Sequence, residues 1–210
     1  RVGLLEPAGR PRAARHPVVS RAGSGPGRLY VVRHGATEWS RSGRHTSRTD
    51  LALLPDGEAE ALELKERLGG TGFALVLTSP RTRARSTAAL AGYPDAVVDE
   101  DLREWDYGSY EGMTRSQIAD LDPGWEIWTG PTPEGESPAE VEERLDRVIA
   151  RVLGAEGHVL VFSHGHLSRA LAARWIGQPL RLGASLQLGT AAVSILGQDR
   201  GTRVIERWNL

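Results

Sequence analysis

Short apolar segments alternate with amphipathic segments along most of this chain, and this alternation restricts the folds that it can adopt. The apolar segments that predict strands lie at 29–32, 74–77, 96–98, 159–162, 192–196 and 203–207. The segments that predict helices lie at 55–68 and 81–91, in a short stretch after 114, and at 137–153 and 166–176. Strands that alternate with helices favour a mostly parallel sheet with helices packed on its faces. We therefore expect an α/β fold in the form of a three-layer α/β/α sandwich.

Residues that favour helix ends support several of these boundaries. Pro55 stands at the start of one predicted helix, and two glycines follow its end. Thr114 is followed three residues later by Gln117, and Ser137 is followed in the same way by Glu140. This spacing is typical of a capping box, in which each side chain bonds the backbone N–H of the other residue. Helices are therefore expected to begin directly after 114 and after 137.

The composition is that of an ordinary globular protein. Of the 210 residues, 40% are hydrophobic and 25% are charged, and the formal net charge is −1. This charge gives no reason to expect a nucleic-acid partner. The absence of cysteine rules out disulfides and cysteine-bound zinc, and no apolar run approaches the roughly 20 residues that span a membrane. We expect a cytoplasmic protein that binds neither nucleic acid nor membrane.

The first 28 residues differ from the rest of the chain. They contain six arginines but a single acidic residue, Glu6, together with four prolines and five glycines. Because they show no helical or strand period, 1–28 are predicted to form a disordered or tail segment. An arginine-rich and acid-poor composition also leaves a targeting peptide open. The remainder, 29–210, is expected to form one domain.

Three polar clusters stand where predicted strands end. They are Arg33-His34-Gly35, Ser79-Pro80-Arg81-Thr82-Arg83 and Ser163-His164-Gly165-His166. In open α/β sheets, ligands bind beyond the carboxyl ends of the strands, and helix N-termini at that edge favour phosphate. The clusters therefore predict that two histidines and at least one arginine surround a single anion. A fourth cluster, at 102–108, adds the carboxylate of Glu104.

In this order, the clusters resemble the motifs of the histidine phosphatase superfamily, which is also called phosphoglycerate mutase-like. The run Leu29-Tyr-Val-Val-Arg33-His34-Gly35-Ala-Thr-Glu-Trp39 resembles the first signature of that family. Its second arginine motif resembles Ser79-Pro80-x-x-Arg83-Ala84-x-x-Thr87-Ala88, its acid-bearing loop Leu102-x-Glu104-x-x-Tyr107-Gly108-x-Tyr110-Glu111-Gly112, and its second histidine motif Ser163-His164-Gly165. The resemblance covers about 29–208 and implies a phosphoglycerate mutase-like sandwich.

The resemblance implies a role for each motif residue. His34 is the expected nucleophile and carries a transient phosphohistidine. Glu104 is expected to protonate the leaving oxygen and later to take a proton from water. Arg33, Arg83 and His164 are expected to hold the phosphoryl oxygens, a task that suits the planar guanidinium group. Because these groups supply the positive charge, neither a metal nor a cofactor is expected.

The resemblance also implies a set of secondary substrate-binding residues. These are Ser40, Thr46, Ser47 and Gly165. Ser40 stands where the family usually has asparagine, so it offers a shorter hydrogen-bonding group. Thr46 and Ser47 are also residue types that favour ordinary turns. For His166 three roles stay open, namely contact with the leaving group, capping of a helix, and an ordinary place on the surface.

Three functions are compatible with such a pocket. The preferred function is that of a phosphomonoesterase, which hydrolyses small phosphorylated metabolites. The alternatives are phosphotransfer of the phosphoglycerate mutase type and an inactive, phosphate-binding regulatory domain. The loop at 125–136 is acidic and aromatic, so it is expected to repel a doubly charged phosphoglycerate, which favours hydrolysis. The predicted partner is a small-molecule phosphate ester, and a homodimer stays open.

Overall fold

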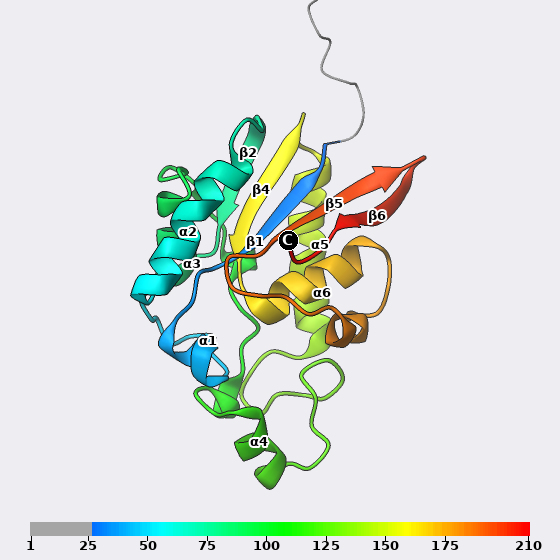
Figure 1. Ribbon diagram of the computed structural model, residues 1–210. Helices are drawn as coiled ribbons and strands as arrows, with labels where there is room; N and C mark the ends of the chain where they lie inside the picture. The colour runs from blue at the N-terminus through cyan, green and yellow to red at the C-terminus, as the bar shows by residue number, and fades with distance from the viewer. Residues whose placement is uncertain (1–26) are drawn as a thin grey trace, which may run out of the picture.

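The computed structural model describes residues 27–210, and its centre is a sheet of six strands (Figure 1). The strands are β1 (Leu29–Arg33), β2 (Phe73–Thr78), β3 (Val97–Val98), β4 (His158–Ser163), β5 (Val193–Asp199) and β6 (Thr202–Arg207). Their order across the sheet is β3-β2-β4-β1-β5-β6. The first four positions in this order pair in parallel, whereas β5 pairs antiparallel with both β1 and β6. The predicted α/β fold with a mostly parallel sheet is confirmed.

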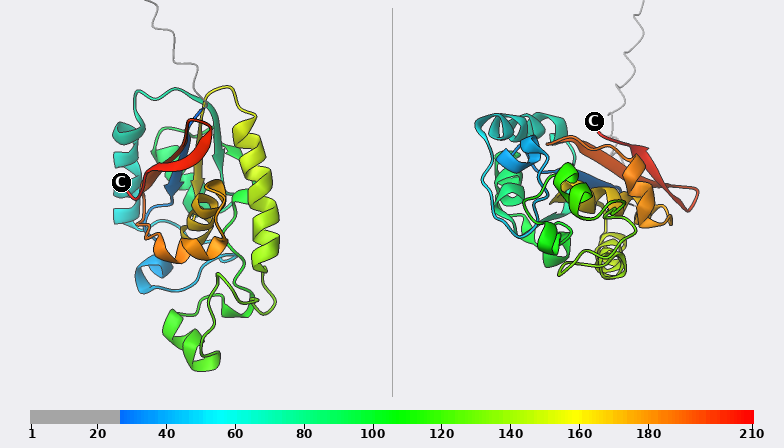
Figure 2. Two further views of the ribbon diagram at one scale, coloured as in Figure 1. Left: turned by 90° about the vertical axis from the view of Figure 1, so that its right-hand side faces the viewer. Right: turned by 90° about the horizontal axis from the view of Figure 1, so that it is seen from below.

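Helices cover both faces of the sheet, which gives the three predicted layers (Figure 2). The α-helices are α1 (Glu38–Ser42), α2 (Pro55–Leu68), α3 (Thr82–Leu90), α4 (Arg115–Leu121), α5 (Pro138–Leu153) and α6 (Gly165–Trp175). Short 3₁₀ helices occupy Glu100–Leu102, Gly108–Tyr110 and Leu180–Ser185. Helices α2 and α3 pack on one face, and α5 and α6 pack on the other. Within 27–210, no helix combines the length and the apolar character that crossing a bilayer requires.

The central strands divide their side chains between two apolar cores. In β1, Leu29 and Val31 join the core under α5 and α6, whereas Val32 joins the core under α2 and α3. In β4, Val161 and Phe162 separate in the same way. Because successive strand residues point to opposite faces, an uninterrupted apolar run fills both cores. In β1 and β4, Arg33 and Ser163 stand at the carboxyl ends, directly after these apolar runs.

Capping boxes begin three of the helices. Those of α4, built on Thr114, and of α5, built on Ser137, follow the predicted pairs. A third begins α1, where the Thr37 hydroxyl and the Ser40 hydroxyl bond each other's backbone N–H. Helix α1 was not predicted, because serine replaces the glutamate or glutamine that marks this motif.

Most of the predicted tail at 1–28 lies outside the described residues. Its last residue, Arg28, belongs to the fold. The Arg28 N–H donates to His158 Nδ1 at 3.0 Å, and the Arg28 carbonyl accepts from the Val159 N–H at 2.9 Å. The chain is thus already in register with β4 at Arg28.

Helices α1 and α4 and the loops around them lie beyond the carboxyl ends of β1, β2 and β4 (Figure 1). Two glycines let the loop after β1 pack directly on the start of α2. A Cβ atom at Gly35 would come within 2.3 Å of the Gly57 carbonyl oxygen, and one at Gly57 within 2.2 Å of the Ala36 carbonyl oxygen. This backbone-to-backbone contact fixes the chain directly after His34.

Candidate active site

The parallel pairing of β1 and β4 brings two histidines together. Arg33 pairs with Ser163 at the ends of these strands, and the N–H of His34 donates to the Ser163 carbonyl at 3.0 Å. The ring centroids of His34 and His164 lie 5.2 Å apart, with 62° between the ring planes. The cluster after β2 joins them, because His164 Nε2 lies 2.7 Å from the Ser79 hydroxyl. All three polar clusters therefore meet at one edge of the sheet.

A backbone contact fixes the orientation and the tautomer of His34. Its Nδ1 lies 2.8 Å from the Gly35 carbonyl oxygen. Since a carbonyl can only accept, Nδ1 carries the hydrogen and the lone pair of the neutral ring is on Nε2. Burial, together with the positive charges of Arg83 and Arg33, lowers the pKa of His34 well below its usual value of 6.5, although the Gly35 contact opposes this. His34 therefore offers a neutral nucleophilic nitrogen.

Arg33 has an unused hydrogen-bond donor beside this imidazole. One terminal nitrogen donates to the Leu188 carbonyl at 2.6 Å, whereas Nε is buried and has no hydrogen-bond partner within the described part of the chain. Gly165, the first residue of α6, packs on this group, and a Cβ atom there would lie 3.4 Å from Arg33 Nε. Burial lowers the pKa of Arg33, because a cation removed from water is costly. A bound anion would compensate both the charge and the unpaired donor.

Arg83 and His164 lie behind His34 without exposed surface. Arg83 Nε donates to His164 Nδ1 at 3.2 Å, so His164 Nε2 carries the hydrogen that it donates to the Ser79 hydroxyl. The terminal nitrogens of Arg83 donate to the carbonyls of Thr46, Ser47 and Thr49. Arg83 thus ties the end of β4 to the 46–49 loop and places a fixed positive charge beneath His34.

The carboxylate of Glu104 faces the N-terminus of α6. Its Oε1 accepts from the backbone N–H groups of Trp105 at 2.9 Å and Leu167 at 2.8 Å, and its Oε2 accepts from that of His166 at 3.0 Å. The first N–H groups of a helix lack partners within the helix and favour negative charge. Arg103, the residue before Glu104, forms its ion pair with Glu136 and not with Glu104. Glu104 is therefore held in one orientation in the pocket that also contains His34.

This pocket has a volume of about 180 Å³. The predicted site residues that line it are Arg33, His34, Ser40, Thr46, Glu104 and Gly165. The volume is large enough for a phosphoryl group and the first atoms of its ester. Within 27–210, no group of three or more histidine, aspartate or glutamate side chains is arranged to hold a metal ion.

The hydroxyls of the secondary residues already have partners in the protein. The Ser40 hydroxyl accepts from the Thr37 N–H at 2.8 Å as part of the α1 cap. Ser47 is buried and does not line the pocket, and its hydroxyl donates to the Glu111 carboxylate at 2.5 Å. Glu111 also accepts from the backbone N–H groups of Ser47 and Thr49. The sequence motif contains Glu111, and the structure places it as the group that holds the loop bound by Arg83.

Three side chains without a settled role also line the pocket. The rings of His45 and His166 are nearly parallel, with centroids 5.7 Å apart, and the Tyr107 hydroxyl lies 2.5 Å from His166 Nδ1. Burial lowers the pKa of both histidines and raises that of Tyr107, so all three are uncharged near neutral pH. Tyr107 belongs to the acid-bearing motif. His45 has no motif to mark it and reaches the pocket because its Nδ1 donates to the Met113 carbonyl at 2.9 Å.

A second pocket of about 390 Å³ adjoins the first, because His45, His166 and Arg169 line both. Arg115 and Glu126 supply further charged groups to its wall. Its apolar and aromatic lining comes mainly from Ile118, Trp125, Ile127 and Trp128. The space beyond His34 is therefore amphipathic.

The acids of the 125–136 loop do not all direct their charge into these pockets. Glu136 pairs with Arg144 and Arg103, and Glu134 accepts from the Ser109 hydroxyl. Glu126 is the acid of this loop that lines the second pocket, where two arginines also lie. These placements remove the basis for the expected repulsion of a second anionic group.

We predict that the His34 ring is neutral, with its hydrogen on Nδ1, in mildly acidic solution. In ¹H–¹⁵N NMR spectra of the imidazoles, the His34 signals can be assigned by their loss in His34→Gln. Because burial and two guanidinium groups disfavour the imidazolium form, the ring should gain its second proton only when the pH falls well below 6.5. A titration midpoint at or above 6.5, or an Nε2–H tautomer, contradicts this assignment.

Comparisons with known proteins identify the family to which the chain belongs. The sequence profile of the histidine phosphatase superfamily (branch 1) matches residues 29–210. An acid phosphatase of Mycobacterium tuberculosis is 42% identical over 180 residues, which cover 84% of this chain and 89% of the relative. A sedoheptulose 1,7-bisphosphatase of Saccharomyces cerevisiae is 38% identical over 183 residues, which cover 71% of this chain and 68% of the relative. The solved structure of a Mycobacterium tuberculosis open reading frame product superposes with a TM-score of 0.84 at 40% sequence identity. The match covers 88% of this chain and 97% of the solved chain. The chain belongs to the histidine phosphatase superfamily, branch 1.

Proposed function

We propose that this phosphatase hydrolyses small phosphate monoesters in two steps, through a phosphohistidine on His34. The observation that carries the proposal is an oriented, neutral imidazole in the same pocket as a buried carboxyl group, that of Glu104. Two of the relatives described above are phosphatases, which supports hydrolysis as the overall reaction. The catalytic unit extends over 29–210 as a single domain. A cytoplasmic location and a homodimer stay predictions from the sequence.

In the first step, Nε2 of His34 attacks the phosphorus atom of the bound ester. The bond between phosphorus and the ester oxygen breaks, and its electron pair goes to that oxygen. Glu104, in its protonated form, donates the proton that converts this oxygen into the hydroxyl of the released alcohol. The ring becomes positively charged, and the hydrogen bond from Nδ1 to the Gly35 carbonyl stabilises that charge.

In the second step, a water molecule attacks the phosphorus atom of the phosphohistidine. Glu104, now a carboxylate, takes a proton from this water, and the bond between phosphorus and Nε2 breaks. The electron pair returns to the ring, so His34 is again neutral when inorganic phosphate leaves. Glu104 has recovered its proton, and the cycle is balanced.

Guanidinium groups stabilise the phosphoryl oxygens, whose charge dominates such a transition state. Arg33 donates through its unpaired N–H, and Gly165 leaves room beside it. Arg83 and His164 act from beneath His34, as a fixed charge and an aligned imidazole. Of the secondary residues, Ser40 and Thr46 contact the substrate at the pocket wall, and Ser47 holds the loop that carries Thr46.

The leaving group extends past His45 and His166 into the second pocket. The tryptophans of this pocket suit the carbon skeleton of a polyol or sugar. Arg115 suits a second anionic group at the end of the substrate away from His34. Arg115 is exposed and forms no ion pair within the described residues. The relative from yeast is named for a bisphosphorylated sugar, which supports this class of substrate.

A radiolabelled phosphate ester tests the covalent intermediate. Brief incubation should leave an acid-labile, base-stable label on the wild-type protein and none on His34→Ala. Glu104→Gln should slow release of phosphate from an alkyl ester by about 100-fold or more, because it removes the general acid and base. An unlabelled wild-type protein that hydrolyses no ester would favour a binding domain. Interconversion of phosphoglycerates that is faster than phosphate release would favour a mutase.

The Arg115→Gln substitution tests the second pocket. The KM for a sugar bisphosphate should rise by about 5-fold, because a partly exposed ion pair with the substrate is lost. The KM for the matching monophosphate should stay unchanged, as should both constants in the control Arg85→Gln, which removes an exposed arginine from α3. Equal effects of Arg115→Gln on the two substrates contradict the assignment.

A further inference from the structure

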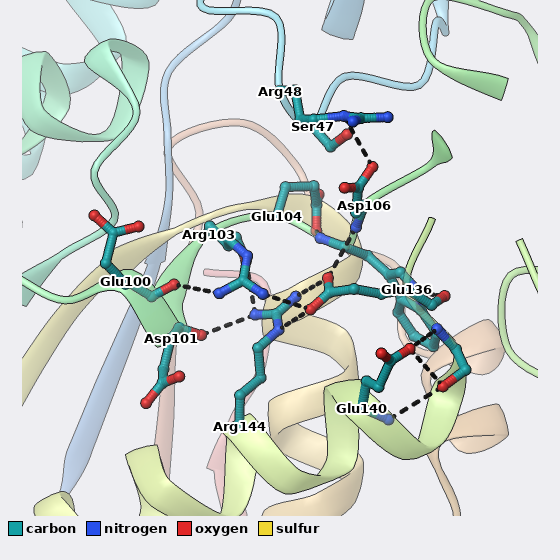
Figure 3. Close-up of polar contacts among 12 residues, drawn as sticks. Ser47, Arg48, Glu100, Asp101, Arg103, Glu104, Asp106, Glu136, Glu140 and Arg144 are labelled. Carbon is teal, nitrogen blue, oxygen red and sulfur yellow. Dashed lines mark hydrogen bonds and ion pairs between the residues drawn. The ribbon is translucent and has the colours of Figure 1, made fainter. Parts of the chain in front are cut away.

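We infer that Glu136 and Arg144 are positioning residues, which hold the backbone on both sides of Glu104 so that its carboxyl group can act as acid and base. The inference rests on the proposed role of Glu104. Neither residue lines the pocket that contains His34. Their effect on the reaction is therefore exerted through the chain at 101–106 (Figure 3).

Arg144 is buried on α5 and uses its guanidinium group in two directions. Its Nε and one terminal nitrogen each donate to one carboxylate oxygen of Glu136 at 2.8 Å. Its other terminal nitrogen donates to two backbone carbonyls, those of Asp101 and Arg103, both at 2.8 Å. A single side chain thus bonds two backbone carbonyls in the segment directly before Glu104.

Glu136 forms hydrogen bonds with the two residues directly after Glu104. One carboxylate oxygen accepts from the Asp106 N–H at 3.0 Å, and its backbone carbonyl accepts from the indole N–H of Trp105 at 3.0 Å. Its backbone N–H donates to the Asp106 carbonyl at 3.0 Å. Arg103 is the third residue that bonds this carboxylate, after Arg144 and Asp106, and its side chain donates at 2.8 Å. The capping box of Ser137 and Glu140 fixes where α5 begins and therefore where Glu136 lies (Figure 3).

Glu104 lies in the middle of the 101–106 segment, and its side chain does not contact Glu136 or Arg144. Its carboxylate turns instead to the N-terminus of α6. The carbonyl of Leu102 is held from the same side by the Ser163 hydroxyl at 2.9 Å, at the end of β4. The segment is therefore fixed between α5 on one side and the β4–α6 connection on the other, and Glu104 cannot shift without breaking several buried hydrogen bonds.

The energetics of burial favour a positioning role over a purely stabilising one. Arg144 has a side-chain exposure of 1% and Glu136 of 11%, and a buried ion pair often contributes no more stability than apolar residues of the same volume. What an apolar pair cannot supply is donors and acceptors for the carbonyls and N–H groups around Glu104. General acid catalysis needs that geometry, since a displacement of about 1 Å can reduce a rate by about 100-fold.

The test uses the rate of phosphohistidine formation in a single turnover, measured with two phosphate donors. p-Nitrophenyl phosphate releases a weakly basic oxygen that needs little help from an acid, whereas glycerol phosphate releases a strongly basic oxygen that needs a proton. In Glu136→Gln, the rate with glycerol phosphate should fall by about 10- to 100-fold, while the rate with p-nitrophenyl phosphate should fall by less than about 3-fold. Such a selective loss is the signature of a displaced acid.

The matched control is Arg147→Gln on the same helix. Arg147 forms an exposed ion pair with the Asp101 side chain but does not contact the backbone around Glu104. Both donors should react with this variant as with the wild type. If Glu136→Gln does not unfold cooperatively on heating, Arg103→Gln replaces it, because Arg103 is one-third exposed and bonds the same carboxylate from the surface. The same selective loss is then expected, at smaller size.

Glu104→Gln separates this inference from the proposed function. If Glu104→Gln shows the selective loss but the folded Glu136 or Arg103 variant slows both donors equally, or neither, the positioning inference is wrong. If Glu104→Gln itself shows no selective loss, the role of Glu104 is wrong, whatever the other variants do. Selective loss in Glu104→Gln and in the folded Glu136 or Arg103 variant supports the role of Glu104 and the positioning inference together.

Discussion

The register between β1 and β4 is the constraint on which the rest of the site depends. Because the two strands run parallel and Arg33 pairs with Ser163, the residues that follow them, His34 and His164, come to lie side by side. A shift of β1 by one residue against β4 would turn the side chain of His34 to the opposite face of the sheet from that of His164. The apolar residues of both strands resist such a shift, since it would exchange the contents of the two cores. Packing of the sheet thus determines the geometry of the reacting groups.

Burial gives this site its chemical character. Burial and the arginines close to them lower the pKa of His34 and His164, so the site holds positive charge on its guanidinium groups while both imidazoles are neutral. The carboxyl group of Glu104 accepts hydrogen bonds from the N-terminus of α6, and within 27–210 it forms no ion pair with those arginines. The contacts of Arg83 with the 46–49 loop and of Arg144 with the 101–106 segment follow one pattern, in which a buried guanidinium group organises backbone carbonyls. Buried arginines thus shape the walls of the site.

Local sequence signals predicted the strands, most of the α-helices and the polar residues at strand ends, because strand periodicity and capping boxes act over a few residues. Contacts between distant segments left no such signal. Nothing in the sequence near Arg144 indicates that it faces 101–106 rather than solvent, and His45 reaches the pocket through a carbonyl 68 residues away. The charge of the 125–136 loop was misjudged because a count of acids does not show that Glu136 is already paired. Ser47 illustrates the same limit, since its hydroxyl is engaged by Glu111.

The central claim is that the edge of the sheet holds His34 with Nδ1 bonded to its own chain and Nε2 directed to the phosphoryl group. The position of phosphorus on the trapped intermediate tests it most directly. Rapid quenching in base during turnover, followed by peptide mass spectrometry and ³¹P NMR of the isolated phosphopeptide, identifies both the residue and the nitrogen. The account predicts phosphorus on Nε2 of His34. Phosphorus on Nδ1 of His34, or on His164, His166 or any other residue, would contradict it.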